Sequence, residues 1–109
     1  MGKNIKLVTF VPVDSADKVR EAMGKAGAGA LGDYRSCSWS ANGYGRFTPE
    51  KGANPAIGEV GKPETVQEER IEVIVERSKA KQVIAALRKA HPYEEVAFDL
   101  IELLDEDEL

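Results

Sequence analysis

Apolar and polar residues alternate along four stretches of the chain, the pattern typical of strands whose two faces meet different surroundings. These stretches cover residues 5–13, about 33–41, 66–75 and 96–103. In 5–13 both sets of alternating positions carry apolar side chains. We therefore expect this strand at the centre of a sheet, with both of its faces covered.

Two further stretches have the three-to-four-residue apolar spacing of an amphipathic helix. The first follows Asp14 or Ser15, whose side chains can accept hydrogen bonds from the first-turn amides, and ends at Gly27. The second starts near Ser78 and stops before Pro92, because the residue ahead of a proline disfavours helical geometry. The two apolar stripes consist of Ala16, Val19, Ala22, Met23 and Ala26, and of Ala80, Val83, Ile84, Leu87 and Ala90.

The order strand-helix-strand occurs twice, without internal sequence repeats or a linker. This order predicts an α+β ferredoxin-like fold, the split βαβ arrangement (βαββαβ), with an antiparallel sheet and two helices on one face. We expect a single domain over residues 1–104, followed by an acidic tail at 105–109. The sheet face away from the helices would still carry Val8 and Phe10, so we expect a second copy of the chain to cover it.

The connection at about 42–64 is unusually long for a compact domain and contains five glycines and three prolines. Three roles stay open for it: an ordered structural or oligomer-forming loop, a site for a small anion or nucleotide, and a mobile partner-binding loop. The residues that we single out in this loop are Gly43, Gly45, Phe47, Gly58 and Gly61.

Residues 91–95 form the densest group of polar side chains outside the tail, with His91, Tyr93, Glu94 and Glu95. Cys37 would add a thiolate if the fold brought it close. Cysteine, histidine and glutamate suit zinc or copper better than calcium. Cys37, His91 and one glutamate supply three of the four ligands of a tetrahedral site, which leaves an open position or one for a neighbouring subunit.

Each of these residues also has a purely structural interpretation. His91 could simply end the second helix, where the last carbonyls favour a cation. Cys37 could be a buried apolar filler rather than a reactive thiol. Trp39 could belong to the core or to an interface, and the sequence does not separate the two.

Charge and composition exclude several classes of function. Four of the 19 acidic residues lie at 105–108, and without them acids and bases balance at 15 each. This balance gives no basic surface for DNA or RNA. No apolar run approaches the length needed to cross a membrane. A single cysteine excludes an intramolecular disulfide, which favours the cytoplasm, and a single histidine excludes sites built from several imidazoles.

Five segments, in order, resemble the YqfO-type domain of the NIF-three-like proteins, which are often labelled GTP cyclohydrolase I type 2 homologues. The resemblance covers nearly the whole chain. The segments are GDYRSCSW (32–39), GYGRFTP (43–49), GANPAIGEVG (52–61), ERIE (69–72) and AHPYEEVAFD (90–99). Within them, Cys37, His91 and Glu95 are the matching positions of most chemical interest.

This resemblance implies a fold similar to the PII signalling and CutA proteins, which assemble as trimers by packing their sheets around a threefold axis. Larger members of the family hold a two-metal site in two lobes through several histidines, and one histidine cannot rebuild such a centre. We therefore expect a non-enzymatic oligomeric binding or regulatory module, with a metal or small ligand at subunit clefts. The alternatives are a metal-dependent hydrolase of a nucleotide-like substrate that uses His91 and Glu94 or Glu95, and an assembly platform for a protein partner.

Overall fold

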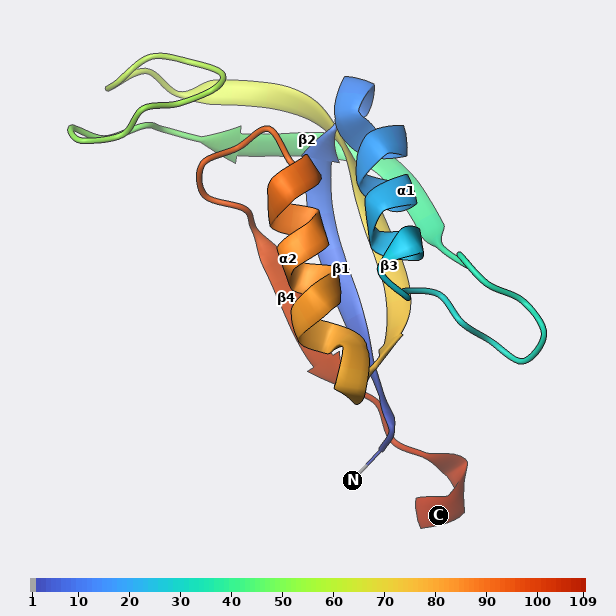
Figure 1. Ribbon diagram of the computed structural model, residues 1–109. Coiled ribbons are helices and arrows are strands. Elements are labelled where there is room, and N and C mark those ends of the chain that lie inside the picture. Colours follow the sequence, from blue (N-terminus) through green and yellow to red (C-terminus); the bar gives the residue numbers. More distant parts are fainter. Residues whose placement is uncertain (1) are drawn as a thin grey trace.

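The computed structural model describes residues 2–109 and shows a four-stranded antiparallel sheet with two helices on one face (Figure 1). The strand order is β2-β3-β1-β4, which confirms the predicted ferredoxin-like α+β fold with its central first strand. In chain order the elements are β1 (Asn4–Pro12), α1 (Ala16–Lys25), β2 (Trp39–Phe47), β3 (Glu64–Glu76), α2 (Ala80–Ala90) and β4 (Phe98–Glu102). A 3-10 turn precedes each helix, Val13–Ser15 before α1 and Arg77–Lys79 before α2. A third 3-10 turn, Glu106–Glu108, lies in the acidic tail.

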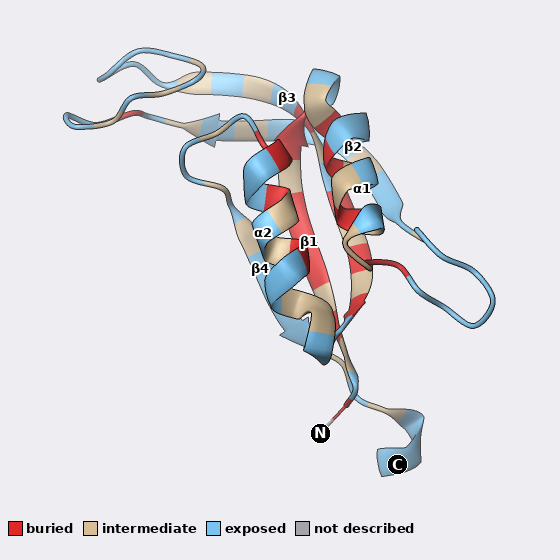
Figure 2. Cartoon of the chain, viewed as in Figure 1, coloured by how far each residue is buried: buried red, intermediate tan, exposed pale blue. Residues whose placement is uncertain are grey.

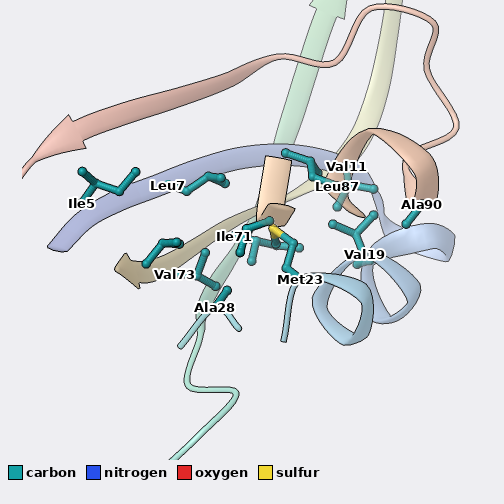
Figure 3. Close-up of a cluster of buried hydrophobic side chains, with 13 residues drawn as sticks. Ile5, Leu7, Val11, Val19, Met23, Ala28, Ile71, Val73, Leu87 and Ala90 are labelled. Carbon is teal, nitrogen blue, oxygen red and sulfur yellow. The ribbon is translucent and has the colours of Figure 1, made fainter. Parts of the chain in front are cut away.

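The hydrophobic core lies between the two helices and the face of the sheet that they cover (Figures 2 and 3). Alternate residues of β1 and of the second half of β3 point into it, as alternation in a strand requires. The helices add the predicted stripes, of which Val19, Met23, Val83 and Leu87 are fully buried. From the strands the core takes Ile5, Leu7, Val11, Ile71, Val73 and Val75.

The start of α1 differs from the prediction. Ser15 occupies the N-cap position, but its side chain makes no capping hydrogen bond. Instead the chain enters the helix through the 3-10 turn Val13–Ser15, and the amide of Ala16 bonds to the carbonyl of Val13. The predicted end at Gly27 is confirmed, since this glycine has φ +113°, a left-handed value that favours glycine.

Strand β2 lies later in the sequence than predicted. Residues 31–34 close a turn through paired backbone bonds between Leu31 and Tyr34, and Ser36 has φ +58°, so no strand forms there. The strand instead runs through Gly43 and Gly45 to Phe47 and pairs with the first half of β3. The connection beyond the sheet is therefore residues 48–63 rather than 42–64.

The paired ends of β2 and β3 project past the helices, which makes the molecule elongated, with extents of 49 × 25 × 23 Å (Figure 1). At the other end, the 3-10 turn Glu106–Glu108 carries the exposed acidic residues of the tail. None of the described helices is long and apolar enough to span a membrane.

Candidate functional site

His91 joins the end of α2 to the end of β1. Its Nε2 lies 2.7 Å from the carbonyl oxygen of Phe10, and the amide of Tyr93 donates to its Nδ1 at 3.1 Å. Because Nδ1 accepts a hydrogen bond, the ring proton is on Nε2, which donates to Phe10. The side chain is 6% exposed. Both ring nitrogens are therefore used by backbone groups, and a metal would have to displace one of them.

The structure places the neighbouring glutamates on a different surface. Glu94 accepts a hydrogen bond from the amide of Asn54 at 2.9 Å and so ties residues 91–97 to the long loop. Glu94 and Glu95 are exposed and line a small hollow with Phe47 and Ile57. The carboxylate of Glu94 therefore holds the loop, and neither glutamate is among the hydrogen-bond partners of the His91 ring in the described residues.

Cys37 lies far from His91. Its amide bonds to the carbonyl of Gly29, whose own amide bonds to the carbonyl of Ile74. His91 instead contacts Phe10, which pairs with Arg70. Four residues along β3 separate these two points, about 13 Å at the usual rise of a strand. Among residues 2–109, no three His, Cys, Asp or Glu side chains gather as a metal site would require. Binding of zinc or copper by Cys37, His91, Glu94 and Glu95 thus stays a prediction.

Tyr93 and Glu68 form a polar contact that the sequence did not reveal. The Tyr93 hydroxyl donates to Oε2 of Glu68 at 2.9 Å, and its ring packs edge-on against Phe47 with centroids 5.7 Å apart. Glu68 is only 7% exposed. Burial, together with the carboxylates of Glu68 and Glu64, raises the pKa of Tyr93 above its usual range.

Gly45 makes room for this buried carboxylate. A Cβ atom at Gly45 would overlap the carboxyl group of Glu68, whereas a Cβ at Gly43 would meet nothing within 4 Å. Gly45 therefore has a packing role on a strand, and Gly43 leaves open space beside it. The sequence alone could predict only part of this contact. Glycines in a strand indicate that another group approaches the backbone closely, but they do not show which group it is.

A hollow of about 530 Å³ lies above these two glycines. We call it the Glu68 hollow; its main side chains are those of Phe10, Ala41, Phe47, Glu68, Arg70 and Tyr93. Arg70 is bonded through Nε to Glu72 at 3.1 Å and lies over the ring of Phe10. The site therefore combines three aromatic rings, a buried carboxylate and an arginine that is already paired.

The remaining loop glycines shape turns. Gly58 and Gly61 have φ of +95° and +83°, and the amide of Gly61 bonds to the carbonyl of Pro49 at 2.8 Å. That amide is thus not free to bind an anion. Their placement supports an ordered loop, and a nucleotide site there stays a prediction.

Among residues 2–109, no helix or strand covers the face of the sheet away from the helices, which we call the open face (Figure 1). Its edges are apolar and accessible: Trp39 on β2 is 58% exposed and Ile101 on β4 is 44% exposed. The centre of this face carries charged side chains instead. Glu72 bonds to Lys6 on the neighbouring strand β1 and to Arg70 on its own strand, and Val8, which pairs with Glu72 in the register, is buried.

Comparison with known proteins shows what this chain is similar to. The chain is 50% identical over 103 residues to the GTP cyclohydrolase 1 type 2 homolog of Halalkalibacterium halodurans, which covers 94% of this chain and 28% of that protein. The Bacillus subtilis and Mycobacterium tuberculosis homologs are also 50% identical, over 87% and 91% of this chain and 26% of each protein. No protein-family model matches.

Solved structures show the same similarity. A Bacillus cereus protein related to NIF3 superposes with a TM-score of 0.82 at 45% identity, over 94% of this chain and 26% of that chain. This chain is a relative of the NIF-three-like family. It spans about a quarter of the length of these relatives, so it corresponds to one segment of them.

The fold of this NIF-three-like segment also occurs in CutA proteins. The periplasmic divalent cation tolerance protein CutA of Archaeoglobus fulgidus has a TM-score of 0.66 at 14% identity, over 92% of this chain and 83% of that chain. CutA1 of Pyrococcus horikoshii has a TM-score of 0.65 at 18% identity, over 95% and 89%. At these identities the likeness concerns the fold, and it confirms the predicted resemblance to the CutA architecture.

Proposed function

We propose that this NIF-three-like domain is an oligomer-forming binding module that associates with copies of itself through the open face. One observation carries the proposal: the sheet is covered by helices on one side only, and its uncovered side exposes Trp39 and Ile101 on its two edge strands. Apolar groups on both borders of one face are typical of an interface between chains. A trimer is the state that the resemblance to PII and CutA proteins implies.

The charged groups at the centre of this face are compatible with association. Lys6 and Arg70 both bond to Glu72 within one chain, so each of these charged groups has a partner, although the three together carry one net positive charge. A second chain that covered them would need an acidic group opposite this charge, because burying an uncompensated charge is costly. Tyr93 and the Glu68 hollow would then lie beside the boundary between subunits, where a ligand could be held.

The hydrolase alternative has no specific observation in its favour. It needs His91 to bind a metal, and both nitrogens of His91 are hydrogen-bonded to backbone groups. A cytoplasmic location, which the single Cys37 favours, and a separate protein partner stay predictions.

The proposal is tested by measuring the mass of the protein in solution with light scattering during size-exclusion chromatography. We expect an oligomer for the unmodified chain and mainly monomer for Trp39→Lys, whose new ammonium would lie beside Glu72 in the register. The matched control is Leu31→Lys, which replaces an apolar residue of similar exposure in the turn at 31–34. A monomeric unmodified chain, or equal effects of both variants, would contradict the proposal.

A further inference from the structure

Glu68 is a buried carboxylate without a cation. Its hydrogen-bonding partner is the neutral hydroxyl of Tyr93, and no ion pair joins Glu68 to a lysine or arginine within residues 2–109. Buried carboxylates are ordinarily paired, because taking an unpaired charge out of water is costly. The cost is lowered when a cation binds beside the carboxylate, so this arrangement favours a cationic ligand.

The two arginines that line the hollow do not fill this role. Arg70 is bound to Glu72 and lies over Phe10, at 5.9 Å from the ring centroid. Arg46 lies at an even-numbered position of β2, and alternation directs its side chain to the opposite face from Phe47. Glu64, which pairs with Phe47 on the same face as Glu68, adds a second negative charge near Tyr93.

The walls of the hollow suit a cation that has an apolar body. Phe10, Phe47 and Tyr93 contribute aromatic rings, and the faces of such rings attract ammonium and guanidinium groups. The space above Gly43 is open, and at about 530 Å³ the hollow is within the range of small-molecule sites. Aromatic walls with a carboxylate at their base are a recurrent way to bind organic cations.

We propose that the Glu68 hollow binds a small organic cation, a primary ammonium or guanidinium group on an apolar body, with Glu68 as the counter-ion and Phe10, Phe47 and Tyr93 as the aromatic walls. Tyr93 holds Glu68 in place as a positioning residue. All residues that line the site belong to one chain, so this inference goes beyond the proposed self-association. Phe10 and Arg70 also lie on the open face, so binding and the mass of the protein are measured together.

The test is calorimetric titration of the full chain with 2-phenylethylammonium and with n-butylguanidinium. The neutral control is 2-phenylethanol, which has the same ring and chain length without the charge. We expect saturable binding of the cations and about tenfold weaker or no binding of the alcohol, a difference of about 1.4 kcal/mol. Equal binding of the alcohol, or no saturable binding of either cation up to about 10 mM, would overturn the proposal.

Two variants locate the site. Glu68→Gln keeps the shape and the acceptor for Tyr93 but removes the charge, so we expect affinity to fall by about tenfold or more. Glu59→Gln makes the same change on an exposed residue of the loop and should leave affinity unchanged. Gly43→Val fills the hollow from an open position and should abolish binding, which decides the matter if Glu68→Gln fails to fold.

Unchanged affinity in Glu68→Gln or in Gly43→Val would refute the site. The mass of the protein is measured in the same samples, so the two proposals can fail separately. A monomer that binds the cations refutes self-association alone, and an oligomer that binds none refutes the cation site alone.

Discussion

The two faces of this sheet share the same two central strands, β1 and β3, but different interactions stabilise them. On the helix face, Ile71 is fully buried among other apolar side chains. On the open face, the next residue along β3, Glu72, links Lys6 and Arg70. One face is therefore closed by apolar burial within the chain, whereas the other carries ion pairs at its centre. Alternation in β1 and β3 produces both, because successive residues of a strand point to opposite faces.

The largest expected effect on stability comes from replacing isoleucine by alanine on the helix face, compared with the same replacement on the open face. Ile71→Ala should lower the free energy of unfolding by about 2–5 kcal/mol, because it leaves a cavity in the core. Ile101→Ala, at a 44% exposed position, should cost less than about 1 kcal/mol in the monomer. Urea denaturation at low protein concentration measures both. Similar losses in the two variants would show that the faces do not differ as the structure indicates.

The second effect concerns His91, which joins the end of α2 to the end of β1. His91→Ala leaves the carbonyl of Phe10 and the amide of Tyr93 without their partners, and we expect a loss of about 1–3 kcal/mol in unfolding free energy. Lys89→Ala, an exposed change near the same helix end, is the control. An unchanged unfolding free energy in His91→Ala would argue for a ligand-binding role instead of this structural one.

The third effect is a difference in stability between alanine substitutions at two glycines of β2. Gly45→Ala would push the Glu68 carboxylate from its place and weaken its bond to Tyr93, for a loss of about 1–2 kcal/mol. Gly43→Ala meets nothing and should be neutral or slightly stabilising. Thermal unfolding of the two single variants gives the comparison. Equal midpoints would mean that Gly45 has no special packing role.

These glycines also show which features the sequence pattern does not predict. The periodicity of β1, β3 and both helices was sufficient for the fold, because each pattern is local and continuous. Gly43 and Gly45 looked like part of a loop, since nothing local reveals that Glu68 will pack against one of them. His91 and Tyr93 were noticed because they are neighbours in sequence, whereas the partner of Tyr93 lies 25 positions away. The site depends on strand register, which the alternation alone does not supply.

The smallest effect is a change in how stability depends on alkaline pH. Burial, and then Glu68, raise the pKa of Tyr93 in the folded protein, so the phenol ionises more readily in the unfolded chain. The stabilisation is therefore complete below the usual value of 10.0 and is lost progressively as the pH rises above it. Tyr93→Phe removes the ionisable group. Its unfolding free energy, measured between pH 9 and pH 12, should therefore fall less steeply with pH than that of the unmodified chain. The difference in slope should correspond to about one proton released on unfolding.

Tyr34 is the control for this measurement, because it is 75% exposed and lies in the turn at 31–34. Tyr34→Phe should leave the alkaline slope unchanged. If Tyr93→Phe and Tyr34→Phe behaved alike, the hydroxyl of Tyr93 would not be held by Glu68 in solution. The Glu68 hollow would then lack the contact that orients its carboxylate, and the contrast between Gly43 and Gly45 should disappear with it.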